Sequence, residues 1–84
     1  MDKITLSSGR ELDILSIGSV AGYLFIRVAM SEAEAREFFN GNTEQLVYTD
    51  EEGNRMEING FKHLAYIVVE RNCVRIALTE EADG

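Results

Sequence analysis

The sequence predicts a mainly β, α+β fold of about seven short, mostly antiparallel strands. We expect these strands to form a small barrel or a two-sheet sandwich with one short helix. Alternating apolar runs recur along the chain between Gly, Asn, Asp and Ser turn signals, and only residues 31–40 show helical spacing. Because the connections are short, neighbouring strands are expected to pair antiparallel. The 84 residues suffice for one domain, 1–84.

The first two strands are predicted at Lys3–Leu6 and Glu11–Ile17, paired as a hairpin across the turn signal that separates them. Apolar and polar residues alternate in the second run until Leu15, where the alternation shifts by one position. A β-bulge near Leu15 would explain that shift. The small residues of Gly18–Gly22 predict the next turn.

The third strand is predicted at Tyr23–Ala29, where both faces carry large side chains. One face carries Leu24, Ile26 and Val28, and the other carries Tyr23, Phe25 and Arg27. Since a strand that is apolar on both faces is usually covered on both, we expect this strand to be central.

The single helix is predicted at about 31–40, between the third and fourth strands. Ser31 is placed to cap the first turn, and Glu34 can complete a capping box. One face carries the apolar residues Ala35, Phe38 and Phe39. Gly41 can take the left-handed conformation that ends a helix. A helix this short does not persist alone in water, so its phenylalanines must pack against the strands.

The next two strands are predicted at Glu44–Thr49 and Arg55–Asn59, joined by the polar hairpin loop Asp50–Asn54. In the second of these strands Met56 and Ile58 alternate with polar residues. We therefore expect both apolar side chains to point inward.

The last two strands are predicted at Phe61–Glu70 and Cys73–Thr79, separated by a tight turn at Arg71–Asn72. The first contains the longest apolar run of the chain and is expected to be buried. In the second, the residues expected to point inward are Val74, Ile76 and Leu78, with Arg75 pointing outward. The acidic tail 80–84 is expected to fray.

Charge and composition exclude several classes of partner. The chain contains eight Lys and Arg residues and fifteen Asp and Glu residues, which gives a net charge of −7. This balance argues against nucleic acid as a partner and against an anionic membrane surface. No apolar run approaches the ~20 residues of a membrane helix, and no signal peptide follows Met1. We expect a cytoplasmic protein.

His63 and Cys73 are the residues with the most obvious chemical potential, since each is the only one of its type. A histidine without a second ligand is weak support for a metal or a catalytic site. The turn at Arg71–Asn72 places Val69 or Glu70 opposite Cys73, so a Cys–His pair is not expected. We predict a histidine at the surface or the rim and a half-buried structural cysteine, with no catalytic residue, no metal and no cofactor.

Two acidic groups could in principle carry chemistry. Glu11 and Asp13 share one face of a strand, which is also common on solvated strands. The residues of 50–54 have the composition of a calcium loop but lack its spacing and its distal bidentate glutamate. A polar turn is the favoured interpretation.

Several aromatic residues lie on predicted strands, namely Tyr23, Phe25, Tyr48, Phe61 and Tyr66. Core packing is the favoured interpretation, and stacking of nucleic-acid bases is the alternative. The alternative, an OB-like domain that binds single strands, requires the cationic side chains to gather beside Tyr23 or Phe25. Those side chains are Arg10, Arg27, Arg55, Lys62, Arg71 and Arg75.

Patterns along nearly the whole chain resemble those of a known protein family. The matching stretches are 4–12 (ITLSSGREL), 24–28 (LFIRV), 30–39 (MSEAEAREFF), 59–64 (NGFKHL) and 74–78 (VRIAL). They look like small proteins encoded among the tail genes of prophages in Gram-positive bacteria. The resemblance implies a structural or assembly protein of a tail or baseplate, located in the cytoplasm or the virion, and it brings no catalytic residue with it.

The sequence thus predicts a non-enzymatic structural or protein-interaction module. Its expected partners are other protein subunits or further copies of itself, because exposed strand edges can pair. Two alternatives stay open at this point. One is an OB-like domain that binds single-stranded nucleic acid, and the other is a small enzyme that uses His63 together with a carboxylate.

Overall fold

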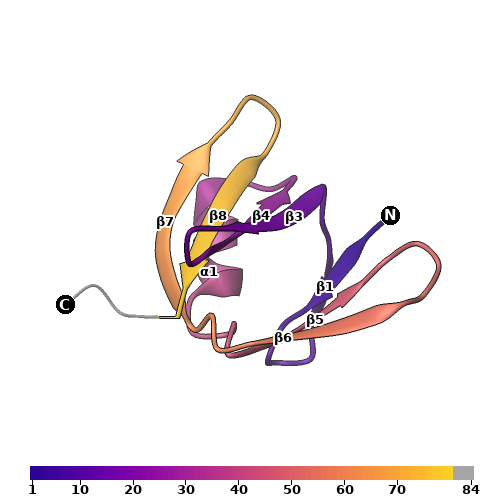
Figure 1. The fold of residues 1–84 in the computed structure, drawn as a ribbon. Helices are drawn as coiled ribbons and strands as arrows, with labels where there is room; N and C mark the ends of the chain where they lie inside the picture. The colour runs from indigo at the N-terminus through magenta and orange to yellow at the C-terminus, as the bar shows by residue number, and fades with distance from the viewer. Residues whose placement is uncertain (81–84) are drawn as a thin grey trace.

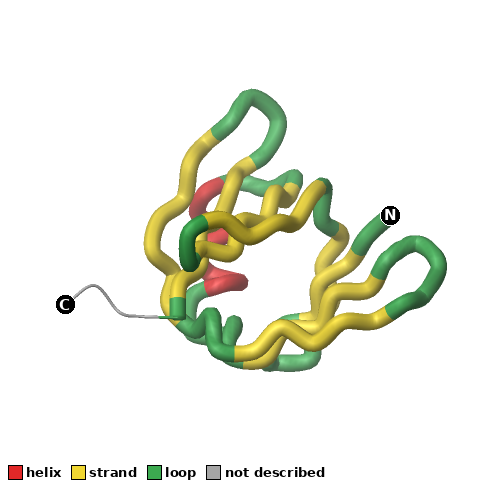
Figure 2. Tube along the Cα trace, in the orientation of Figure 1, coloured by secondary structure: helices red, strands yellow, loops and turns green. Residues whose placement is uncertain are grey.

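The protein forms eight strands and one helix in residues 1–80, the part of the chain that this computed structural model describes (Figures 1 and 2). The elements are β1 Lys3–Thr5, β2 Glu11–Asp13, β3 Ser16–Val20, β4 Tyr23–Val28, α1 Glu32–Phe39, β5 Gln45–Thr49, β6 Arg55–Asn59, β7 His63–Val69 and β8 Val74–Thr79. The predicted mainly β fold is confirmed, with eight strands in place of about seven.

The strands form two four-stranded sheets, with the orders β2-β1-β5-β6 and β3-β4-β8-β7. Every neighbouring pair is antiparallel, as predicted. In the described residues the strand ladders do not join into one closed ring, so the barrel alternative is wrong and the two-sheet alternative holds. Each sheet therefore has two edge strands, and the sheets face each other across the core.

The chain crosses from one sheet to the other between Ile14 and Leu15. The N–H of Ile14 donates to the carbonyl of Asp2 in the first sheet at 2.9 Å, and the N–H of Leu15 donates to the carbonyl of Arg27 in the second at 2.8 Å. The shift in alternation at Leu15 marks this crossing, so the predicted bulge is wrong.

The crossing divides the predicted strand Glu11–Ile17 into β2 and β3. β3 also continues to Val20, so the turn comprises only Ala21 and Gly22, both with positive φ. The helix therefore follows the fourth strand, β4, and its predicted place between the third and fourth strands is wrong.

Helix α1 begins and ends where its capping residues predict. The hydroxyl of Ser31 accepts from the N–H of Glu34 at 3.2 Å, and both halves of the capping box are present. Gly41 has φ of 81°, in the left-handed region. The helix packs against β7 and β8, with Phe39 fully buried and Phe38 partly buried against the core.

The core lies between the inner faces of the two sheets and α1. Its buried members are Ile4, Leu6, Ile14, Leu24, Ile26, Val28, Ala35, Phe39, Leu46, Val74, Ile76 and Leu78. The inward positions predicted for β8 are confirmed. On β4, the residues that point inward are Leu24, Ile26 and Val28, which the alternation had assigned to one face. The central position predicted for β4 is also confirmed, because β3 and β8 flank it.

Two predictions of burial are wrong because β6 and β7 are edge strands. Met56 on β6 is 54% exposed, although Ile58 is half-buried against the core. On β7, which was expected to be buried, Val69 is 63% exposed and Tyr66 is 43% exposed. Of the predicted acidic tail 80–84, residues 81–84 lie outside the described part.

Candidate docking face on the second sheet

The outer face of the β3-β4-β8-β7 sheet carries a cluster that we call the aromatic face, defined by Tyr23, Phe25, Tyr66, Arg75 and Ala77. Strand alternation produces it, because Leu24 and Ile26 fill the core and their neighbours on β4 must point outward. Phe25 on β4 is opposite Ala77 on β8, and Arg27 on β4 is opposite Arg75 on β8. The aromatic face therefore follows from the same alternation that builds the core.

The three rings of the aromatic face contact one another. Tyr23 and Phe25 are stacked, with centroids 5.9 Å apart and planes 26° apart. The ring of Tyr66 lies tilted against both, at 6.0 and 6.4 Å. Ala77 is the cross-strand partner of Phe25 and Tyr66 and is fully buried.

These three aromatics lie outside the core, so their predicted role in core packing is wrong. Strand alternation assigns Tyr23 and Phe25 to the face opposite the buried residues of β4. Tyr48 and Phe61 are packed, partly buried, against the core, so the interpretation holds for them.

A β-bulge brings Tyr66 to this face. Leu64 pairs with Leu78, but the next paired residue on β7 is Tyr66, opposite Ala77. Ala65 is the extra residue between them. Without it, Leu64 and Tyr66 would point to the same side of the sheet. The bulge allows Leu64 to pack against the core while Tyr66 joins the outer cluster.

Arg75 adds a cation to the aromatic face. Its guanidinium carbon lies 5.4 Å from the centroid of the Phe25 ring, within the range of a cation–π contact. Its Nε is buried and has no hydrogen-bond partner among the described residues. Its cross-strand neighbour on β4 is a second cation, Arg27.

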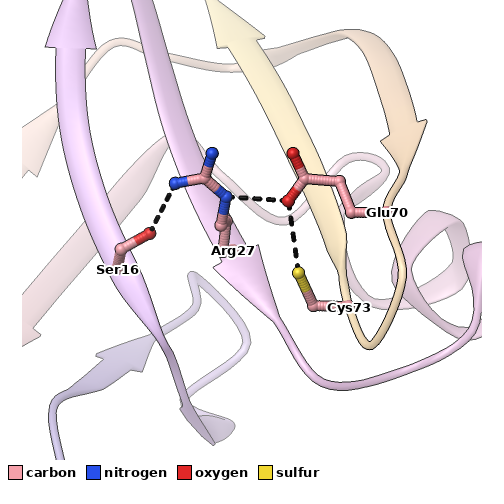
Figure 3. Close-up of polar contacts among 4 residues, drawn as sticks. All are labelled: Ser16, Arg27, Glu70 and Cys73. Atoms are coloured by element: carbon pink, nitrogen blue, oxygen red, sulfur yellow. Dashed lines mark hydrogen bonds and ion pairs between the residues drawn. The ribbon is translucent and has the colours of Figure 1, made fainter.

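A polar network borders the aromatic face (Figure 3). The Nε of Arg27 donates to Oε1 of Glu70 at 2.8 Å, and one terminal nitrogen donates to the hydroxyl of Ser16 at 3.4 Å. The thiol of Cys73 donates to the same oxygen of Glu70 at 3.3 Å. The network joins β3 and β4 to the β7–β8 turn.

The network shifts the pKa of each ionisable member. Hydrogen bonds, first from Arg27 and then from Cys73, lower the pKa of Glu70. The same carboxylate raises the pKa of Arg27. Burial, followed by the hydrogen bond to Glu70, raises the pKa of Cys73. Since thiolate is the reactive form of cysteine, this environment favours a structural thiol.

A hollow of about 250 Å³ opens beside the aromatic face, between β3, β4 and β8. Its lining residues include Ser16, Phe25, Arg27 and Arg75, so two arginines, a serine and an aromatic residue border the same space. This arrangement can receive a small polar or anionic group next to apolar contacts.

His63 lies elsewhere, opposite Thr79 at the start of β7. It borders a separate hollow of about 320 Å³, and none of the described acidic residues lines this hollow. Cys73 lies opposite Glu70, whose N–H donates to the carbonyl of Cys73 at 2.9 Å. The predicted separation of Cys73 from His63 is confirmed.

The acidic candidates serve as turn and edge residues. Oδ1 of Asp50 accepts from the N–H groups of Glu52 and Asn54, both at 2.9 Å, which closes the β5–β6 loop. These bonds lower the pKa of Asp50. Glu11 and Asp13 are exposed on the edge strand β2. In residues 1–80, no group of three or more His, Cys, Asp or Glu could hold a metal ion.

The cationic residues are divided between several parts of the fold. Arg27 and Arg75 lie beside Phe25. The guanidinium of Arg10 lies over the ring of Phe38, 4.5 Å from its centroid. Arg55 is on β6 of the other sheet. The gathering that the OB-like alternative requires is thus reduced to two arginines, of which Arg27 is already paired with a carboxylate.

Comparisons of the chain with protein-family models, with curated proteins and with solved structures gave no match. Within residues 1–80, no helix is long and apolar enough to cross a bilayer.

Proposed function

We propose that the chain is a non-enzymatic protein-interaction module whose partner docks on the aromatic face. The observation that carries this proposal is a three-ring cluster with an arginine on the outside of a sheet whose inner face already packs the core. Tyrosine and arginine are enriched among the residues that dominate binding energy at protein interfaces. Large side chains gathered on an outer face are also the feature by which docking surfaces differ from scattered apolar residues.

Packing within the sheet explains the contacts between the rings but not the apolar surface that stays exposed. Contacts between cross-strand aromatic residues stabilise a sheet, and the three rings have such contacts. Those contacts leave Tyr66 43% exposed and Val20, on neighbouring β3, 65% exposed. A partner that covers them would gain about 25 cal/mol for each Å² of apolar surface removed from water.

The resemblance of the sequence to prophage tail proteins supports a more specific form of the proposal. In this form the module joins other subunits of a tail or baseplate, in the cytoplasm during assembly or in the virion. Flanking genes for tail or capsid proteins would support this form, and flanking genes of an unrelated pathway would contradict it.

Site-specific photocrosslinking tests the docking face. The photoreactive residue p-benzoylphenylalanine replaces Tyr66 in one variant and Met56 in a control, because Met56 is also exposed but lies on the other sheet. In cells that encode the protein, we expect a discrete adduct from position 66 and none from position 56. The captured protein is then purified and must bind the unmodified chain.

Equal adducts at the two positions, or none at position 66, would contradict the proposal. A single-stranded oligonucleotide at low salt provides the comparison with the nucleic-acid alternative, because the stacked rings and Arg75 are features that bases can also use. Fluorescence anisotropy should stay unchanged if the partner is a protein.

A further inference from the structure

We propose that the hollow beside the aromatic face receives an aspartate or glutamate side chain of the docking partner, held by Arg75. This inference rests on the proposed function and specifies the chemistry of the partner. The occupant is the carboxylate of a different protein, presented among apolar side chains that cover the rings.

The first argument is the charge balance on this part of the sheet. Arg27 and Arg75 are directly opposite each other on β4 and β8, an arrangement in which like charges repel. In the described residues Arg27 forms an ion pair with Glu70, whereas Arg75 forms none. Arg75 therefore has no carboxylate within ion-pair distance. The charge of Glu70 acts on it from farther away, and Glu70 is already bonded to Arg27.

The second argument is the unmet hydrogen-bonding capacity of Arg75. A guanidinium has five N–H donors, arranged to bind a carboxylate with two parallel bonds. Within residues 1–80, Nε is buried without an acceptor, and the guanidinium contacts the ring of Phe25. A carboxylate in the hollow reaches the terminal nitrogens first, and rotation of the side chain away from the ring would then bring Nε to it.

The third argument is size. The hollow of about 250 Å³ is smaller than the roughly 300–1,000 Å³ of small-molecule sites. It is also open to the same side as the rings, so an inserted side chain can belong to a protein that covers the aromatic face. One acidic side chain fits this space and complements its charge.

A second copy of the chain fits less well than a different protein. If two aromatic faces met around a two-fold axis, each Arg75 would approach the same face of the other copy. The carboxylate that borders this face, Glu70, is already bonded to Arg27 and to Cys73. The net charge of −7 on each copy adds repulsion.

NMR titration with a small carboxylate tests the inference even before the partner protein is identified. The probe is N-acetylglutamate α-methylamide, whose only charge is the side-chain carboxylate. Its neutral control is N-acetylglutamine α-methylamide, and the readout is the Nε–H resonance of Arg75. We expect a saturable shift with the acidic probe and binding about tenfold weaker for the neutral one, the loss of a hydrogen bond to a charged group. Arg55 is the internal control, because it lies on the other sheet and forms no ion pair within residues 1–80.

Each other outcome is decisive. Equal shifts at Arg75 and Arg55, equal binding of the two probes, or no shift at Arg75 would overturn the inference. If a single-stranded oligonucleotide bound near Arg75 more tightly than N-acetylglutamate α-methylamide, nucleic acid would replace protein as the proposed partner. A crosslink from position 66 that persists unchanged when Arg75→Gln is added would overturn the acidic contact alone. Absence of this crosslink while Arg75 is still present would overturn the docking face itself.

Discussion

Thr43 shows how a single residue can join two parts of this fold. It lies in the loop after α1 and is fully buried, and its hydroxyl donates to the carbonyl of Phe61 at 2.6 Å. The bond ties this loop to the connection between β6 and β7. No periodicity or turn signal identifies it in the sequence, because both partners are in irregular segments that are distant along the chain.

Thr43→Val is expected to lower the free energy of unfolding by about 1–3 kcal/mol, because the carbonyl of Phe61 loses its buried donor. Urea denaturation measures this loss. Thr43→Ser is the matched control: it keeps the hydroxyl and should lose only about 0.8 kcal/mol for the missing methyl group. Equal losses in the two variants would show that the hydrogen bond contributes nothing.

Glu70 is expected to make stability depend on acid pH. Its pKa in the folded protein is below the ordinary value of 4.5. The stabilisation is therefore present above pH 4.5 and is lost as the pH falls through the lower, folded value. Glu70→Gln should be less stable than the parent at neutral pH and should lose less stability on acidification. The lowered pKa of Asp50 leaves part of the acid dependence in place.

Urea denaturation as a function of pH measures this effect. Glu57→Gln is the control, since Glu57 is exposed on the edge strand β6. A Glu70→Gln profile parallel to that of the parent at every pH would contradict the assignment of the ion pair with Arg27.

At the scale of elements, local signals predicted the helix well and most of the turns, although the turn predicted at Gly18–Gly22 comprises only its last two residues. Ser31 and Glu34 are only three residues apart, and Gly41 acts on its own backbone, so their effects do not depend on the rest of the fold. The strand details depend on distant partners. The division of β2 from β3 requires Asp2 and Arg27 as acceptors, and the edge position of β7 depends on the order of the sheet.

The candidate site was largely hidden from sequence reasoning for the same reason. Alternation in β4 assigned Tyr23 and Phe25 to one face, but not which face would be covered. The bulge at Ala65 that brings Tyr66 beside them has no local sequence signal, since neither Gly nor an unusual turn residue marks it. The approach of Glu70 to Arg27 additionally required the order of β4, β8 and β7.

Phe39→Ala on α1 is expected to lower the free energy of unfolding by about 3–5 kcal/mol, because the ring is fully buried in the core. Ser31→Ala should cost about 1 kcal/mol through the lost cap. Chemical denaturation measures both. Phe38→Ala is the comparison, and a loss as large as that of Phe39→Ala would contradict the observed orientation of the helix.

Met56→Lys tests the position of β6 as an edge strand. Because Met56 is 54% exposed, the substitution should change the free energy of unfolding by no more than about 0.5 kcal/mol. Ile58→Lys, two residues along the same strand, should be strongly destabilising because it places a charge against the core. Similar effects at the two positions would be inconsistent with the observed burial.

At the scale of the whole molecule, the two sheets differ in what they present outward. The second sheet carries the aromatic face, the hollow and the arginine pair, while exposed β6 and β2 at the edges of the first sheet are dominated by polar and charged residues. The docking proposal is therefore a proposal about one side of an acidic protein. Its test must compare the two sheets in one folded molecule.

The most direct test of the docking face is an affinity measurement with the partner protein that crosslinking identifies. The purified partner, free of the crosslink, is titrated with Tyr66→Lys, with Met56→Lys and with the parent chain. Circular dichroism first establishes that both variants keep the parent fold. We predict that Tyr66→Lys weakens binding about 30-fold or more, the roughly 2 kcal/mol of an interface hot spot, while Met56→Lys binds like the parent. Equal affinity of Tyr66→Lys and the parent would contradict the assignment of the aromatic face as the docking surface.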